Sequence, residues 1–201
     1  MEFSEVIARR RMVRSYDPAR PVPPEARDRL IEAARRAPSA GFAQGWGFLV
    51  LDSAQDRDAF WQATSEPRAA ADRWLRGMRQ APLLIVCFSD RQAYVDRYAL
   101  PDKNERDLDS RWPVPYWHID AGFAALMILL SAVDQGLGAC FFGVPTDRVG
   151  ALRDAFGVAA ALTPVGVVSV GYPAPDGRTA RRGRDRRPAD EVVHLGRWNP
   201  V

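Results

Sequence analysis

The most constraining feature of this sequence is a long apolar segment at residues 116–135. Apolar residues recur there at three- and four-residue spacing, at Ile119, Phe123, Leu126, Met127, Leu130 and Val133. The positions between them are also largely apolar, and a helix that is apolar nearly all round has to be covered on most sides. Its longest charge-free run, residues 121–133, is shorter than the roughly 18 residues of a membrane span. The segment therefore predicts a helix at the centre of a core.

Four short apolar segments have the composition of β-strands. They are residues 46–51, 83–89, 139–142 and 165–170. Segments with helical periodicity lie before and between the strands, at residues 3–11, 21–38, 56–64 and 68–79. A further helix, capped by Thr146 or Asp147, runs through Phe156. The strands are too irregularly spaced for a simple βαβ array. With 201 residues, of which 47% are hydrophobic, we expect one α+β domain over residues 1–201.

Two segments lack a clear period. Residues 90–115 carry many charges and three prolines, and a connection of that length is often a functional lid. Its aromatic residues Tyr94, Tyr98 and Trp112 could lie over a pocket or pin the segment to the surface. Residues 174–201 begin with a run of arginines and are expected to form a C-terminal extension.

The two cysteines, Cys87 and Cys140, lie in strand-like apolar runs, which predicts buried free thiols rather than a disulfide. The two histidines have no partners at the spacing of a zinc site, so we expect no metal. The first five residues include Glu2 and Glu5, where a signal peptide would be basic and then apolar. We therefore expect a soluble protein that stays in a reducing cytoplasm.

Positive charge gathers at both ends of the chain. Four arginines, Arg9, Arg10, Arg11 and Arg14, occur within six residues, whereas Lys103 is the only lysine. The guanidinium fork suits phosphate, and the net charge of +3 also favours an anionic partner. From these residues alone, a solvated helix end, the codon bias of a GC-rich genome and nucleic-acid binding remain open.

Several familiar sites are excluded by their motifs. The sequence has no phosphate loop ending in Gly-Lys-Ser/Thr and no Gly-x-Ser-x-Gly nucleophile elbow. The turn at residues 136–141 starts like a dinucleotide fingerprint, but it follows a helix and lacks the last glycine. What remains is arginine at both ends, small-residue turns and an aromatic interior, which is compatible with a ligand that joins a phosphate to a flat ring.

These residues resemble the nitroreductase family of FMN-dependent oxidoreductases. The family's N-terminal pattern Arg-x-Ser-x-Arg/Lys-x-Phe/Tyr is similar to residues 10–16, and its Ala-Pro-Ser…Gln-Pro-Trp loop is similar to residues 37–46. Further likeness follows in the same order, at residues 120–122, 136–140, 171–173 and 187–194. The resemblance spans nearly the whole chain.

The resemblance implies a three-layer α/β/α fold with a mixed, mainly antiparallel central sheet. It also implies an intertwined homodimer with FMN at the interface. Arg10 would lie near the flavin phosphate and Arg14 near the N1/O2 edge of the ring, with Arg186 or Arg187 completing the phosphate site. The full set of expected cofactor-binding residues is Arg10, Arg11, Met12, Arg14, Pro38, Ser39, Ala40, Phe142, Gly143, Arg186 and Arg187. Of these, residues 38–40 would approach the flavin of the other subunit, and the backbone at 142–143 would face N5.

The implied activity is a ping-pong transfer of hydride from NAD(P)H, through flavin N5, to a nitroaromatic, quinone or similar acceptor. No side chain need act as an acid or base, and Arg14 would give electrostatic support. Met12 stands where the family has serine, Gly45 replaces a proline, and residues 62–79 show no match to the family's flavin contacts. Alternatives are a deazaflavin donor, a specialised dehydrogenase or dehalogenase, a flavin-binding sensor or flavin-sequestering protein without turnover and, less favoured, a nucleic-acid-binding module.

Overall fold

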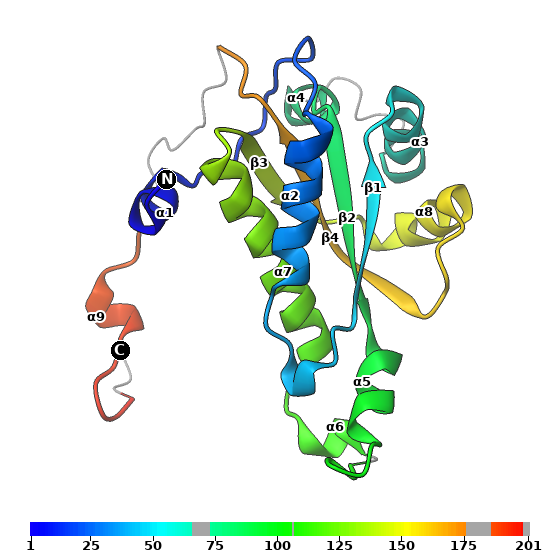
Figure 1. Ribbon diagram of the computed structural model, residues 1–201, viewed down its shortest axis with the longest axis vertical. Helices are drawn as coiled ribbons and strands as arrows, with labels where there is room; N and C mark the ends of the chain where they lie inside the picture. The colour runs from blue at the N-terminus through cyan, green and yellow to red at the C-terminus, as the bar shows by residue number, and fades with distance from the viewer. Residues whose placement is uncertain (66–72, 106, 176–185, 199–201) are drawn as a thin grey trace.

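The computed structural model describes residues 1–65, 73–105, 107–175 and 186–198. A single antiparallel sheet lies at its centre, with the strand order β1-β2-β4-β3 (Figure 1). The strands are β1 (Trp46–Leu51), β2 (Leu83–Asp90), β3 (Gly138–Phe142) and β4 (Leu162–Gly171). All four predicted strands are confirmed. A parallel element appears beside β3, where Met12 forms an isolated bridge with Ala139.

Helices lie on both sides of the sheet and in the segments that connect its strands. They are α1 (Phe3–Arg9), α2 (Pro24–Arg35), η1 (Ala40–Phe42), α3 (Ala54–Thr64), α4 (Arg73–Arg79), α5 (Arg91–Tyr98), α6 (Leu108–Arg111), α7 (Tyr116–Asp134), η3 (Thr146–Arg148), α8 (Val149–Phe156) and α9 (Ala189–Val192). Part of the helix expected at residues 68–79 lies outside the described residues. Thr146 and Asp147 do not cap α8: they form the 3₁₀ turn η3, and α8 starts one turn later without a side-chain cap.

Helix α1 ends at Arg9, two residues earlier than expected. Arg10 already has extended backbone angles, with φ −58° and ψ 123°. The chain then leaves the helix and bridges to β3 at Met12. The arginines from Arg10 to Arg14 therefore lie on an extended segment rather than on a helix end.

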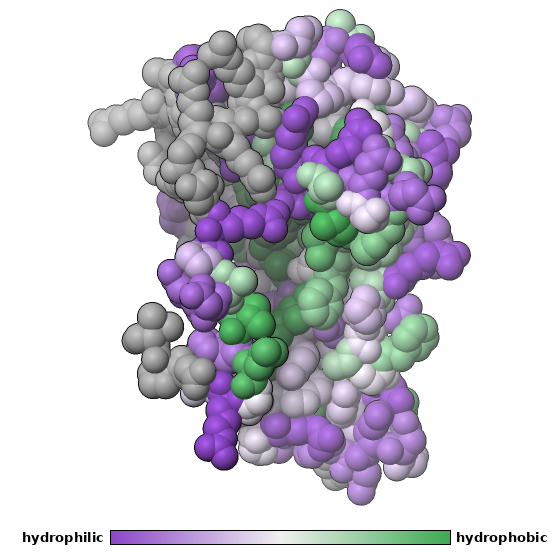
Figure 2. Space-filling view, turned by 90° about the vertical axis from the view of Figure 1, so that its left-hand side faces the viewer, coloured by the Kyte–Doolittle hydropathy of each residue, from purple (hydrophilic) through white to green (hydrophobic). Residues whose placement is uncertain are grey.

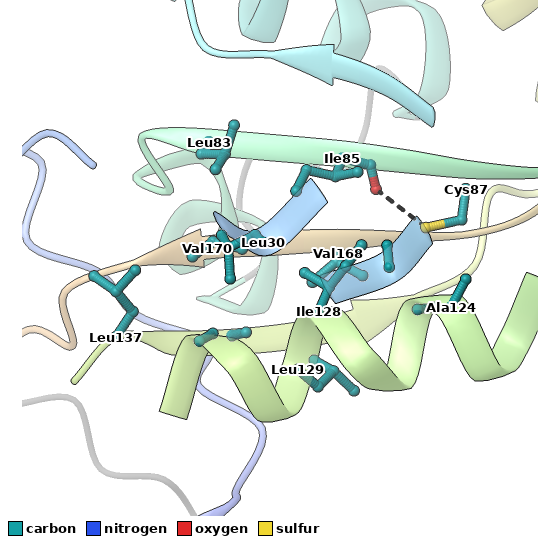
Figure 3. Close-up of a cluster of buried hydrophobic side chains, with 14 of the residues drawn as sticks. Leu30, Leu83, Ile85, Cys87, Ala124, Ile128, Leu129, Leu137, Val168 and Val170 are labelled. Carbon is teal, nitrogen blue, oxygen red and sulfur yellow. Dashed lines mark hydrogen bonds between the residues drawn. The ribbon is translucent and has the colours of Figure 1, made fainter. Parts of the chain in front are cut away.

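One face of the sheet is covered by α2 and α7 (Figure 1). Alternate residues of a strand point to opposite faces, so Leu83, Ile85 and Cys87 of β2 face this layer together (Figure 3). They pack with Leu30 of α2 and Ile128 of α7, both fully buried. The apolar cluster between the sheet and these two helices is the larger of the two main clusters among the described residues.

The central helix α7 confirms the prediction of a core helix, but none of the six residues of the predicted repeat is on its fully buried face. Its buried residues are Asp120, Ala121, Ala124, Ala125, Ile128, Leu129 and Ala132. Four of these seven are alanines, and their small side chains let the helix approach the sheet closely. By length and composition alone α7 could cross a membrane, but its inner face belongs to the main core. Phe123 and Leu126 on its outer face are 43% and 44% exposed.

The opposite face of the sheet is covered by α3, α4 and α8. Phe60 and Trp61 of α3, Met78 of α4 and Leu152 of α8 are buried against the alternate residues of β2 and β4. Val13 and Tyr16 join the same cluster from the N-terminal segment. The chain thus forms three layers, and the segment of residues 10–16, called the arginine segment below, packs between the sheet and the layer of α3, α4 and α8.

Residues 90–115 form α5 and α6 at the end of the sheet where β1 begins (Figure 1). Tyr94, Tyr98 and Leu108 make a third buried cluster, against which Trp112 and the alanines of the 40–43 loop pack. Tyr98 and Trp112 meet edge to face at 4.8 Å between ring centroids. Of the two roles open to these aromatics, the structure supports pinning: they fasten the segment onto a neighbouring loop.

Candidate functional site

The arginine segment runs along the outer edge of β3. The Val13 backbone N–H donates to the Ala139 carbonyl at 2.9 Å, and the Phe141 N–H points to the Met12 sulfur at 3.5 Å. Strand edges carry unpaired backbone groups, and this segment satisfies two of them. Met12, which departs from the family pattern, therefore has a structural use here: its thioether accepts from the strand.

Tyr16 anchors the end of the same segment inside the fold. Its side chain is fully buried, and its hydroxyl donates to the Val13 carbonyl at 2.7 Å and lies 2.8 Å from Ser169 Oγ on β4. Burial raises the pKa of Tyr16, so the phenol stays protonated and can donate. The backbone is held as well, since the Asp17 N–H donates to the Tyr172 carbonyl at 2.9 Å.

Two glycines let other elements approach this segment closely. A Cβ atom at Gly138 would lie 2.7 Å from the Val13 side chain. A Cβ atom at Gly77 of α4 would overlap the backbone carbonyl of Arg14. No motif within residues 62–79 predicts this role of Gly77. Any residue larger than glycine there would force α4 away from Arg14.

Arg14 points outward beside the thiol of Cys140. Its side chain is exposed, whereas Cys140 is only 2% exposed. Burial raises the pKa of the Cys140 thiol, and the nearby Arg14 guanidinium offsets part of that rise by its charge and by a hydrogen bond. In the same stretch Arg10 is half-buried and Arg11 is exposed. The segment thus offers fixed backbone together with accessible positive charge.

Both cysteines are free and buried, as predicted. Burial raises the pKa of Cys87 to about 12. Because the thiolate is the reactive species, we expect both thiols to react with DTNB at pH 8 at least about 100-fold more slowly in the native chain than in guanidinium chloride. Absorbance at constant protein concentration measures the two rates. Fast labelling in the native chain that Cys140→Ser abolishes would contradict burial of that thiol.

Phe142 lies in an aromatic stack that the sequence did not reveal. Its ring is parallel to Trp61 of α3, at 5.6 Å between centroids and 8° between planes. Trp74 of α4 meets it edge-on, also at 5.6 Å. Such pairs stabilise by about 0.5–1.5 kcal/mol beyond the area that they bury. The stack fixes the end of β3, and the next residue, Gly143, is exposed.

The loop at residues 38–45 has an unusual backbone. Gly41, Phe42 and Gln44 all have positive φ angles, of 60°, 58° and 51°. Ser39 Oγ accepts from the Gln44 N–H at 3.0 Å, and the Ala40 N–H donates to Asp120 Oδ2 at 2.8 Å. Pro38 precedes these contacts and is exposed.

Within one chain this loop and the arginine segment lie at opposite ends of the sheet. The loop leads into Trp46, which pairs with Ser89 at one end of β2. The arginine segment lies beside Gly138 and Gly171, at the other end (Figure 1). A single copy of the chain therefore does not bring residues 38–40 next to Arg10 and Arg14.

The C-terminal arginines are not joined to Arg10 by any contact within the described part of the chain. Arg187 pairs instead with Glu191, Nε to Oε2 at 3.0 Å, and Arg186 is exposed. The short helix α9 that follows lies on the same side of the molecule as α1 (Figure 1). The phosphate site expected between the two ends of the chain stays a prediction.

Comparison with known proteins decides the family. The model of the family described as "Nitroreductase family" matches residues 7–172, a range that holds the arginine segment, the 38–45 loop and the whole sheet. The chain belongs to the nitroreductase family. The family match ends before Arg186 and Arg187, so these arginines lie beyond it.

Individual nitroreductase relatives are distant but cover the chain almost completely. A Methanothermobacter thermautotrophicus protein, provisionally named NADH dehydrogenase/NAD(P)H nitroreductase, is 29% identical over 98% of this chain and 88% of its own length. A Staphylococcus aureus (strain MRSA252) NADPH-dependent oxidoreductase is 24% identical over 90% of this chain and 68% of its own length. A Desulfovibrio desulfuricans crystal structure, described as a provisional nitroreductase in complex with FMN, is 27% identical with a TM-score of 0.71, and the match covers 100% of this chain and 99% of that one.

Apolar side chains gather on the face formed by α1, α7 and the C-terminal tail, meaning residues 186–198 (Figure 2). The residues concerned are at least 43% exposed: Phe3, Ile7, Phe123, Leu126, Val192, Val193, Leu195 and Trp198. Exposed apolar patches of this kind mark interaction sites.

Proposed function

We propose that this nitroreductase-family chain is an FMN-dependent oxidoreductase that moves hydride from NAD(P)H to a nitroaromatic, quinone or similar acceptor. Bound FMN would supply the hydride-accepting and hydride-donating chemistry. The observation that carries the proposal is the arginine segment: its backbone is bonded to β3 and the Tyr16 hydroxyl binds Ser169 of β4, while the Arg14 side chain remains exposed. Family membership and the FMN complex of a 27% identical relative support it.

The residues present fit a flavin mononucleotide. The ligand joins a phosphate dianion to a flat ring, and Arg10 and Arg14 offer fixed charges on one short extended segment. Arg10 would hold the phosphate, aided by Arg186 or Arg187. Arg14 would stabilise negative charge at the N1/O2 edge of the ring. The Phe142–Gly143 backbone, held by the stack on Trp61, would face the reactive side.

The protein's share in the reaction is positioning. Donor and acceptor would bind in turn at one site. The chain would therefore need a rigid backbone surface beside the ring and a fixed positive charge, rather than an acid or base. Arg11 and Met12 would contribute through the segment's backbone. The Met12 thioether is directed at the Phe141 N–H, so the loss of the usual serine hydroxyl leaves the strand edge supported.

A second copy of the chain would complete the site. Residues 38–40 and the arginine segment occupy opposite ends of the sheet, so both could reach one flavin only from different subunits. The exposed apolar face of α1, α7 and the tail supplies a surface for such a partner. We therefore propose a homodimer with two flavin sites at its interface.

The absorption spectrum of the purified protein tests this function. We expect the peaks of oxidised flavin after incubation with FMN, and we expect NADH or NADPH to bleach them under anaerobic conditions. Adding a quinone should restore the peaks. A reduced deazaflavin, tested beside both nicotinamides, would reveal a different donor. A chain that takes up no FMN would contradict the proposal, and a flavin-loaded chain that no donor bleaches would point to binding without turnover.

A further inference from the structure

A buried carboxylate joins three elements at the end of the sheet where the 38–45 loop lies. Asp120 of α7 is only 3% exposed. Its Oδ2 atom accepts the Ala40 backbone N–H at 2.8 Å and the Tyr94 hydroxyl of α5 at 2.7 Å. One oxygen atom therefore links the central helix, the loop and the first helix of the 90–115 segment.

We propose that Asp120 and Tyr94 are positioning residues that hold the 38–45 loop and α5 as one unit, so that α5 sets where this loop meets the flavin. The flavin part of this inference rests on the proposed function. Asp120 itself is buried beneath the loop, so its effect would pass through Ala40 rather than through contact with a ligand.

The loop requires such an anchor because its backbone is strained. Phe42 and Gln44 have left-handed φ angles of 58° and 51°, a backbone conformation that is unfavourable for residues other than glycine. Phe42 is also 74% exposed, so burial of its ring within this chain does not compensate. A strained backbone conformation persists only where several surrounding contacts hold it in place.

Helix α5 supplies the remaining contacts. Arg97 Nε donates to the Gly41 carbonyl at 2.7 Å, and its two terminal nitrogens hold Asp102 at 2.8 and 2.7 Å. A Cβ atom on Gly41 would lie 2.7 Å from the Tyr98 ring. A Cβ atom on Gly45 would overlap the Tyr94 ring. The two tyrosines thus lie against the two glycines of the loop.

The protonation of Tyr94 agrees with its role as donor. Its side chain is fully buried, and burial, together with the hydrogen bond to Asp120 and that residue's charge, raises the pKa of Tyr94. Only the protonated phenol can donate this hydrogen bond, and the raised pKa keeps the phenol protonated. A hydrogen bond to a charged acceptor is stronger than one between neutral groups, so this bond helps to offset the strain of the left-handed residues.

Because of these contacts, the 90–115 segment cannot open independently of the 38–45 loop. A lid that opened freely would have to break the contacts of Tyr94 and Arg97 and would release the loop at the same time. Substitutions on the inner face of α5 would consequently alter flavin binding, although α5 itself need not touch the flavin.

Two variants and two controls test the proposal in the full-length chain. Tyr94→Phe removes one donor, and Asp120→Leu removes the acceptor at similar volume. Tyr98→Phe is the matched control, because it removes a hydroxyl from the same helix and cluster, one that makes no hydrogen bond within the described residues. Asp120→Asn is the rescue control, since an amide oxygen can still accept two hydrogen bonds. The measurements are amide hydrogen exchange at Ala40 without FMN, and the FMN dissociation constant from flavin fluorescence.

For Tyr94→Phe and Asp120→Leu we expect exchange at Ala40 and the FMN dissociation constant each to rise about tenfold. Tyr98→Phe should stay within about twofold of the wild type, and Asp120→Asn, which keeps both acceptor contacts but loses the charge, should fall between the wild type and Asp120→Leu. Unchanged exchange in Tyr94→Phe would overturn the anchor, even if Asp120→Leu fails to fold. Faster exchange with unchanged FMN affinity would overturn its link to the flavin. A wild-type chain that takes up no FMN contradicts the proposed function and with it this link, whereas the exchange result still decides the anchor.

Discussion

Replacing Tyr16 with alanine is expected to lower the free energy of unfolding by about 3–5 kcal/mol, the usual cost of emptying a large buried aromatic site. The residue is fully buried in the cluster between the sheet and α3, α4 and α8. Its hydroxyl also ties Val13 to Ser169 of β4. For a chain of this length the melting temperature should fall on the order of 10 °C.

Tyr16→Phe separates packing from hydrogen bonding. It keeps the ring but leaves the Val13 carbonyl without its donor, so we expect a loss of about 1–3 kcal/mol. Tyr172→Phe is the control, because its ring stays under Arg20, 3.6 Å away, and it should change stability by less than about 0.5 kcal/mol. Urea unfolding at one fixed protein concentration gives the comparison. Equal stabilities for Tyr16→Phe and the wild type would mean that the hydroxyl does not anchor the segment.

Replacing Arg10 with alanine is expected to weaken FMN binding about 10- to 100-fold. Arg10 is half-buried where the chain leaves α1, and a charge-assisted hydrogen bond to phosphate contributes about 1.5–3 kcal/mol. Flavin fluorescence on titration measures the change. The expected loss is larger than that of any substitution at an exposed ion pair on the protein surface.

Arg9→Ala provides the matched comparison. Arg9 precedes Arg10 directly, but its guanidinium is paired with Glu5 on the outer side of α1 at 2.9 Å, and its side chain is 61% exposed. Exposed pairs contribute only about 0–1 kcal/mol, so FMN affinity should change less than about threefold. Equal losses in the two variants would show that the cluster acts by its total charge and that Arg10 has no special place in it.

Much of the fold was predictable because segments that are buried carry runs or regular spacings of apolar residues. All four strands and the central helix α7 lie where apolar runs and spacing predicted them, and both cysteines are buried. The ends of elements were less predictable. Helix α1 stops at Arg9 because the chain turns to bridge β3, and no local pattern specifies that pairing.

The candidate site was predictable only in part. Motif likeness led to the arginine segment and the 38–45 loop, and the family match confirms the assignment of the chain to the nitroreductases. The residues that support these segments carry no motif. Gly77 beneath Arg14, Trp61 against Phe142, and Asp120 with Tyr94 became visible only as contacts.

The division has a physical reason. Periodicity and residue type report which side chains leave water, because that choice depends on each segment and its immediate neighbours. Contacts such as Ala40 with Asp120 or Tyr16 with Ser169 join residues 80 and 153 positions apart. Such pairs meet because the sheet and its covering helices bring them together, so their partners are determined by the packing of the whole domain rather than by any stretch of its sequence.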